Sequence, residues 1–258
     1  MNMMTRAVAT GAYRIPRQSV YSRPMDDKPC AADAAFFSDL DRETDFYLIR
    51  HGESEGNARL VMQGLLDLPL NSRGEAQAEA AGVWLADKGV SLLFSSPLRR
   101  ALRTAELIAA RANLPAPRPE PVFTELDTGV FTGLSVQEIR EKHPEVYREF
   151  RTRSWEAVPG AESSASLYDR ALRAWEFLKA RARETEGALA VVSHGGCLQW
   201  MVRATFGCRT WMPLLTTGNC GVFHLNVRPT SPGRPAYMQW KLVNSQPESG
   251  ISATPPVF

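Results

Sequence analysis

The chain has 258 residues, of which 44% are hydrophobic, and its net charge is only +2. This length suits one large domain with tails, and the apolar fraction is sufficient for a sizeable core. The near-neutral charge gives no support to a nucleic-acid-binding protein with a broad basic face, and no apolar run reaches the roughly 20 residues needed to cross a bilayer. Any anion site must therefore be a local cluster of positive side chains.

Residues 1–44 mix Pro, Ser, Arg and Ala without a clear hydrophobic period, so we expect a disordered N-terminal extension. Arginines without any acid before Asp26 are also weakly typical of a transit peptide, and a start codon placed too far upstream would produce the same composition. We place the catalytic domain at residues 45–245 and an irregular C-terminal tail at 246–258.

The four cysteines of the chain are Cys30, Cys197, Cys208 and Cys220. None of them forms a C-x-x-C pair or has a partner at the spacing of a zinc site. A chain of this length does not need disulfides to fold. We therefore expect free thiols in a reducing compartment, which favours a cytoplasmic protein.

From residue 45 onward, short apolar runs alternate with stretches of helical periodicity. The apolar runs predict strands at 46–49, 91–95, 189–193, 221–227 and 237–243. The periodic stretches predict helices at 74–88, 98–113, 135–150, 166–185 and 198–206. The proline-rich segment between residues 114 and 122 is expected to be a connection. This alternation predicts an α/β fold, a three-layer α/β/α sandwich with a mostly parallel central sheet.

Three of the predicted strands end in residues suited to phosphate chemistry. Their carboxyl ends read RHG at 50–52, SPLRR at 96–100 and HGG at 194–196. Ligands of open α/β sheets bind beyond the carboxyl ends of the strands, so these motifs should converge on one crevice. The glycines after each histidine allow sharp turns and the close approach of a ligand.

The residue types in this cluster indicate phosphoryl transfer. Arginine presents a rigid fork of donors that matches phosphate oxygens, and a neutral imidazole can attack phosphorus. Fixed positive charge stabilises the transferring phosphoryl group. Metal ions often supply that charge, but no carboxylate cluster suited to magnesium is evident, so we expect neither a metal nor another cofactor.

These motifs resemble those of the histidine phosphatase superfamily, in its phosphoglycerate-mutase-like branch. The resemblance covers residues 46 to about 227 and is carried by an ordered set of motifs: LIRHGESEGN (48–57), DLPLNSRGEAQA (67–78), SSPLRRALRTA (95–105), ELDTGVFTG (125–133), PGAES (159–163), VVSHGGCLQ (191–199) and GNCGV (218–222). It implies a phosphoglycerate-mutase-like fold and a phosphatase that acts without a cofactor through a phosphohistidine.

The resemblance also assigns roles to individual residues. His51 would be the nucleophile that becomes phosphohistidine, and Glu125 the acid that protonates the leaving-group oxygen. The residues that would hold the phosphoryl oxygens are Arg50, Asn57, Arg100 and His194, with Ser54 as a further candidate contact. Arg99 fills a variable position of the family. For Asn57 a capping role, and for Ser54 a backbone contact, stay open as alternatives.

Within the superfamily the sequence favours hydrolysis. Mutases usually show E-R-x-Y-G, whose arginine and tyrosine hold a carboxylate, whereas residues 125–129 read ELDTG here. The chain is also short of the insertion expected in a mutase between Gly133 and Pro159. The acid-phosphatase branch would continue as R-H-G-x-R-x-P, which this chain does not. The alternatives that stay open are mutase-type phosphoryl transfer and a non-catalytic member that binds a phosphorylated ligand.

The alcohol part of the substrate would be recognised by the variable segments, chiefly 134–165 and the loop after 207. Several basic residues hint at an acidic or multiply phosphorylated substrate, although charged helix faces are usually only solvated: Arg140, Lys142, Arg148, Arg151 and Arg153. Trp155 and Trp211 are candidates for pocket lining or for core packing. We expect a small phosphorylated substrate, with neither nucleic acid nor a membrane as partner; the oligomeric state is not readable.

Overall fold

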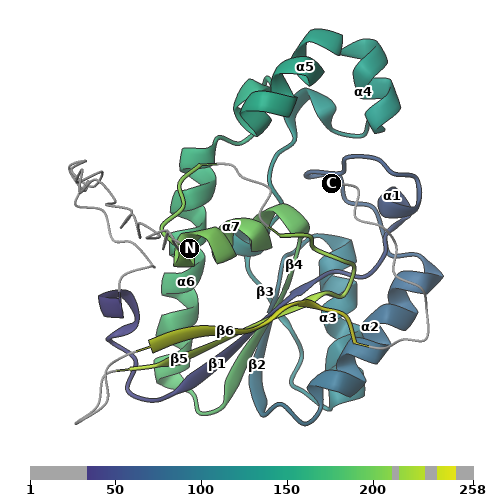
Figure 1. The fold of residues 1–258 in the computed structure, drawn as a ribbon. Helices are drawn as coiled ribbons and strands as arrows, with labels where there is room; N and C mark the ends of the chain where they lie inside the picture. Colours follow the sequence, from purple (N-terminus) through teal and green to yellow (C-terminus); the bar gives the residue numbers. More distant parts are fainter. Residues whose placement is uncertain (1–33, 211–214, 230–236, 248–258) are drawn as a thin grey trace, which may run out of the picture.

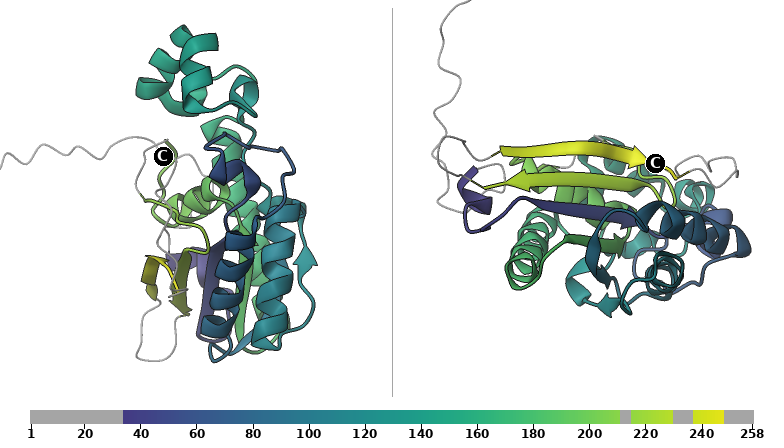
Figure 2. Two further views of the ribbon diagram at one scale, coloured as in Figure 1. Left: turned by 90° about the vertical axis from the view of Figure 1, so that its right-hand side faces the viewer. Right: turned by 90° about the horizontal axis from the view of Figure 1, so that it is seen from below.

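A six-stranded sheet lies between two layers of helices in the computed structural model, which describes residues 34–210, 215–229 and 237–247 (Figures 1 and 2). The strands are β1 (Thr44–Arg50), β2 (Val90–Ser95), β3 (Arg118–Pro119), β4 (Ala188–Ser193), β5 (Val222–Arg228) and β6 (Tyr237–Ser245). Their order in the sheet is β3-β2-β4-β1-β5-β6. The strands β3, β2, β4 and β1 run parallel to one another, while β5 pairs antiparallel with both β1 and β6. The predicted fold class is thus confirmed.

The α-helices are α1 (Glu55–Ala58), α2 (Ser72–Leu85), α3 (Arg99–Ala112), α4 (Val136–Lys142), α5 (Pro144–Arg153), α6 (Ser164–Glu184) and α7 (Gly195–Thr205). Four short 3-10 helices complete the set: η1 (Ala34–Phe37), η2 (Pro121–Phe123), η3 (Gly129–Phe131) and η4 (Ser154–Ala157). Among the described residues, no helix combines the length and the apolar character needed to cross a membrane.

The central strand β1 contributes alternate side chains to two separate cores. Phe46 and Leu48 belong to a buried cluster with apolar residues of α6 and α7. Tyr47 and Ile49 belong to a second cluster with residues of α2 and α3. Because successive side chains of a strand point to opposite faces, helices cover both sides of the sheet. The carboxyl end of β1 is thereby held rigidly from both faces.

The helix predicted at 135–150 is two helices, α4 and α5, because Pro144 interrupts it. Proline lacks a backbone N–H and disfavours helical geometry in the residue before it, and His143 accordingly has φ −133° and ψ 51°. Ser135 and Glu138 form a capping box at the start of α4. Figure 1 shows α4 and α5 projecting beyond the sheet, at the end where α6 begins.

Part of the expected N-terminal extension packs on the domain. Residues 34–44 include η1, and Phe36, Phe37 and Leu40 are buried in the core that contains α6. The ring centroid of Phe37 lies 5.7 Å from that of Trp175. The remaining expectations for both tails concern residues 1–33 and 248–258, which lie outside the described residues, as do Cys30 and Trp211.

Candidate active site

A cavity of about 360 Å³ lies among the residues that follow β1, β2 and β4 and those of α5 and η4. This volume falls within the range of small-molecule sites. Five predicted site residues line it together: Arg50, His51, Asn57, Arg100 and Glu125. The two other predicted residues, Ser54 and His194, are not among the lining residues, but Ser54 is bonded to Asn57 and the His194 ring lies next to that of His51.

His51 follows β1 directly, and only 2% of the residue is exposed. Its Nδ1 lies 2.7 Å from the carbonyl oxygen of Gly52, and because a carbonyl only accepts, Nδ1 carries the ring proton. The lone pair for attack is therefore on Nε2. Burial, and next the charges of Arg100 and Arg50, hold the pKa of His51 well below its ordinary value, so the imidazole is neutral at pH 7.

Arg50 and Arg100 bring positive charge to the cavity, and backbone carbonyls hold both guanidinium groups. Arg50 Nη1 donates to the carbonyl of Thr217, while Arg100 Nη1 and Nη2 donate to those of Leu66 and Gly64 at 2.6 and 2.9 Å. The buried Nε of each arginine has no hydrogen-bond partner among the described residues. Burial lowers the pKa of Arg50, and it lowers the pKa of Arg100 to about 10, which leaves Arg100 charged at neutral pH.

His194 precedes α7 and lies against His51, with ring centroids 5.1 Å apart. The residue is fully buried, and within the described part of the chain neither of its ring nitrogens has a hydrogen-bond partner. Burial, then the charge of Arg100, lowers the pKa of His194 well below its ordinary value. Buried polar atoms are seldom left unpaired in proteins, so these nitrogens are suited to a polar ligand.

Asn57 and Ser54 form the capping box of α1. The hydroxyl of Ser54 and its backbone N–H donate to Asn57 Oδ1 at 2.9 and 3.1 Å, and Asn219 Nδ2 donates to the same oxygen at 3.3 Å. With Oδ1 engaged, Nδ2 is the group that Asn57 can offer to a ligand in the cavity. Ser54 is fully buried, so the structure places it in support of Asn57.

Glu125 is held at the N-terminus of α7. Its carboxylate accepts hydrogen bonds from the backbone N–H groups of Leu126, Gly196 and Cys197 at 2.8, 3.2 and 3.0 Å. The first turn of α7 supplies backbone N–H groups that have no partner within the helix, and these hold the carboxyl group in place. A Cβ atom on residue 196 would lie 2.6 Å from Glu125 Oε1 and would also collide with Leu126, so this approach requires glycine.

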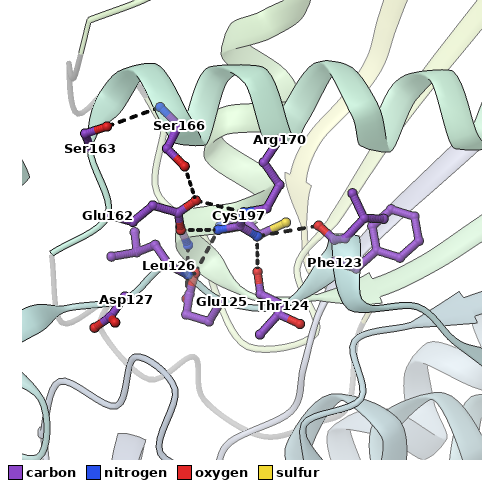
Figure 3. Close-up of polar contacts among 12 residues, drawn as sticks. Phe123, Thr124, Glu125, Leu126, Asp127, Glu162, Ser163, Ser166, Arg170 and Cys197 are labelled. Atoms are coloured by element: carbon purple, nitrogen blue, oxygen red, sulfur yellow. Dashed lines mark hydrogen bonds and ion pairs between the residues drawn. The ribbon is translucent and has the colours of Figure 1, made fainter.

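A half-buried ion pair holds the chain on both sides of Glu125 (Figure 3). Arg170 Nε and Nη2 donate to the two carboxylate oxygens of Glu162 at 3.0 and 2.6 Å, and Arg170 Nη1 donates to the carbonyl of Thr124. The backbone N–H of Glu162 donates to the carbonyl of Asp127 at 3.0 Å. Glu125 therefore lies on a short segment anchored before and after it to the same pair.

Some residues of the site have little signature in the sequence. Thr217 contributes its backbone carbonyl, a group that every residue carries. Arg170 lies in the middle of a helix and outside every motif. Asn219, whose Nδ2 donates to the carbonyl of His51 at 3.1 Å, lies within the motif GNCGV at 218–222, and that match was the available signal.

Comparisons with known proteins identify the family of the chain. The sequence model described as the histidine phosphatase superfamily (branch 1) matches residues 46–237. The chain is 33% identical over 190 residues to phosphoserine phosphatase 1 of Hydrogenobacter thermophilus, an alignment that covers 70% of this chain and 86% of that protein. It is 32% identical over 210 residues to 2-carboxy-D-arabinitol-1-phosphatase of Triticum aestivum, covering 80% of this chain and 41% of the wheat protein.

Solved structures include similar folds. The structure of a mycobacterial glucosyl-3-phosphoglycerate phosphatase in complex with VO3 superposes with a TM-score of 0.67 at 27% sequence identity. That superposition covers 79% of this chain and 99% of the mycobacterial chain. The similarity therefore extends over the sheet and its flanking helices rather than over isolated motifs.

Proposed function

The chain belongs to the histidine phosphatase superfamily and is a phosphatase of that superfamily. We propose that it hydrolyses phosphomonoesters of small metabolites, that His51 becomes phosphorylated during the reaction, and that no metal ion takes part. The observation that carries the proposal is the setting of His51: it is buried, and its Nδ1 lies 2.7 Å from the carbonyl oxygen of Gly52, which assigns the ring proton to Nδ1 and the lone pair to Nε2. Arg50 and Arg100, beside it, supply the positive charge that a phosphoryl group requires.

In the first step the phosphate docks between the two arginines and Nε2 of His51 attacks phosphorus in line. The N–P bond forms as the ester P–O bond breaks, and Glu125 gives a proton to the departing alkoxide. The phosphorylated ring gains positive charge, which its Nδ1–H shares with the carbonyl oxygen of Gly52. The hydrogen bond at Nδ1 thus stabilises the intermediate as well as the reactive tautomer.

In the second step a water molecule attacks the phosphorus atom and the N–P bond breaks. The carboxylate of Glu125 accepts a proton from this water, and inorganic phosphate leaves. His51 returns to its neutral form and Glu125 to its protonated form, so one water is consumed per ester. The three backbone N–H groups that hold Glu125 keep its carboxylate in one place during both steps.

Hydrolysis fits the cavity better than mutase-type transfer. Leu126, at the position where mutases carry an arginine, is apolar and buried. Thr128 lines the cavity, but its hydroxyl is 2.7 Å from that of Thr132. The names of three relatives mention phosphoserine, 2-carboxy-D-arabinitol 1-phosphate and glucosyl-3-phosphoglycerate. These esters are all of small metabolites, which supports the same substrate class here. Their alcohols differ, so the names do not identify the substrate of this chain.

The test is phosphate release from a panel of phosphomonoesters by wild type and by His51→Ala, each with and without excess EDTA. We expect release that resists EDTA and is abolished in His51→Ala. Rapid quenching in alkali with a 32P-labelled ester should trap an acid-labile label on the wild type only. Release that needs a metal, or that survives the loss of His51, would contradict the proposal.

We also place the protein in a reducing, cytoplasmic compartment. Its described cysteines, Cys197, Cys208 and Cys220, are free thiols, and two of them are buried. Thiols that can remain reduced support this placement.

A further inference from the structure

The cavity extends from the phosphoryl site to a surface contributed by α5 and η4. Its lining there includes Phe150, Arg151, Ser154 and Trp155. These residues belong to the helical projection, at a distance in sequence from every residue that touches the phosphoryl group. A phosphomonoester held by Arg50 and Arg100 would therefore present its alcohol part to this surface.

Arg151 differs from the other basic residues of α4 and α5. The others are each paired on the projection: Arg140 with Tyr147, Lys142 with Glu138, Arg148 with Glu145 and Arg153 with Glu149. Arg151 instead lines the cavity, and it makes no hydrogen bond or ion pair with the residues that the structure describes. Its charge is therefore available to a ligand.

Ser154 supplies a second, independent observation. It lines the cavity with 8% of the residue exposed, and its Oγ has no hydrogen-bond partner in the described part of the chain. Its backbone has φ 54° and ψ −143°, a region that non-glycine residues rarely adopt. Unusual backbone of this kind is concentrated at ligand sites. The buried Ser154 hydroxyl and the exposed Arg151 guanidinium line the same cavity and are three residues apart in sequence, so together they offer donors suited to an anion.

The balance of charge in the cavity agrees with an acidic alcohol. The basic residues that line it are Arg50, Arg100 and Arg151, and Glu125 is the acidic residue that lines it. A phosphate dianion would compensate Arg50 and Arg100, and in the proposed cycle Glu125 still carries its proton when the ester binds. The positive charge of Arg151 is then left for a further negative group.

We propose that Arg151 and Ser154 bind a second negative group of the substrate, so that the preferred substrates are phosphomonoesters whose alcohol carries a carboxylate or a further phosphate. This inference rests on the proposed hydrolysis at His51. The site differs from the E-R-x-Y-G position of mutases, where this chain has Leu126 and Thr128. The aromatic rings of Phe150 and Trp155 would contact the carbon skeleton between the two anionic groups.

The experiment compares kcat/KM within two pairs of esters. In the first pair, 3-phosphoglycerate carries a carboxylate where glycerol 3-phosphate has a neutral CH2OH group. In the second pair, fructose 1,6-bisphosphate carries a second phosphate that fructose 1-phosphate lacks. We expect wild type to prefer the more acidic member of at least one pair by about tenfold, because a charge-assisted hydrogen bond is gained. The pair that shows the preference identifies the group.

Three variants assign the preference to residues. Arg151→Gln should remove it by raising KM for the acidic ester about tenfold, with a much smaller change for the neutral ester. Ser154→Gly, whose backbone tolerates a positive φ, should reduce it by about threefold to tenfold. The control is Arg153→Gln, which removes a neighbouring charge outside the cavity and should leave the preference intact.

The two proposals fail in distinguishable ways. Equal kcat/KM within both pairs, or a preference that survives Arg151→Gln, would overturn the anion site while hydrolysis at His51 stands. Absence of a phosphohistidine in wild type with every ester would overturn the proposed function itself.

Discussion

Arg170 and Glu162 form a two-bond ion pair whose side chains are only 13% and 18% exposed, and this pair holds the segment that carries Glu125. Neither residue lines the cavity. Their contribution to catalysis would be to position the carboxylate, because one of them contacts the backbone before Glu125 and the other the backbone after it.

The substitution Arg170→Met should therefore lower kcat for alkyl phosphates by about tenfold to a hundredfold with little change in KM, since small displacements of a catalytic group are costly. The decrease in kcat should be much smaller for p-nitrophenyl phosphate, because its leaving group departs without needing a proton. Arg148→Met, which breaks an exposed pair with Glu145, is the control. Equal losses on both kinds of ester would indicate a general loss of structure instead.

Substitution of Glu125 tests the proton transfer directly. Glu125→Gln keeps the shape of the side chain and one acceptor oxygen, although its NH2 group cannot accept the hydrogen bond from the backbone N–H of Gly196. It cannot give up or accept the proton, so turnover of alkyl phosphates should fall by about 10² to 10⁴. Formation of phosphohistidine from p-nitrophenyl phosphate should persist, which stopped-flow absorbance would record as a burst of nitrophenolate followed by slow turnover. Full turnover of alkyl phosphates by this variant would exclude Glu125 as the acid.

The two adjacent arginines after β2 provide a matched pair. Arg100 is buried and lines the cavity, whereas Arg99 is exposed. Arg100→Ala should reduce kcat/KM by about 10² to 10³, the usual loss for a donor to a developing charge, and Arg99→Ala should stay within about twofold of wild type. Steady-state kinetics on one ester suffice. Comparable losses in both variants would show that general positive charge, and not a placed donor, is what the reaction needs.

The lowered pKa values of His51 and His194 predict a specific dependence of stability on pH. Below the ordinary histidine pKa of about 6.5, the unfolded chain binds protons that the folded chain does not, so the free energy of unfolding decreases as pH falls. Each histidine should contribute a slope of up to about 1.4 kcal/mol per pH unit until its folded pKa is reached.

Urea unfolding at intervals between pH 7 and pH 5 measures this slope. The double variant His51→Gln/His194→Gln should show a shallower loss of stability over the same interval. A wild-type stability that is constant over this interval, or an unchanged slope in the double variant, would mean that both histidines can be protonated in the folded protein.

The sequence was sufficient to predict five of the six strands, because buried strands leave continuous apolar runs, and the motifs follow directly after three of them. It missed β3, whose two residues lie at the edge of the sheet in the proline-rich segment expected to be a connection. The helical period over 135–150 concealed the break between α4 and α5, although Pro144 is itself a signal for one. The sequence could not predict η1, since a 3-10 turn is too short to show a period. The contribution of Arg170 was equally hidden, because an arginine in the middle of a helix is usually solvated. Contacts made by backbone carbonyls, such as that of Thr217, leave no trace in residue type.

The position of β1 has a consequence for the order in which this protein acquires activity. β1 lies early in the chain, yet its sheet partners β4 and β5 and the turn with Asn219 come near the end. A ribosome therefore synthesises His51 long before the partners that hold it exist, and closing such long loops is the slow part of folding. Phosphatase activity would consequently appear only when the last strands are in place, which makes turnover a reporter of complete synthesis and folding.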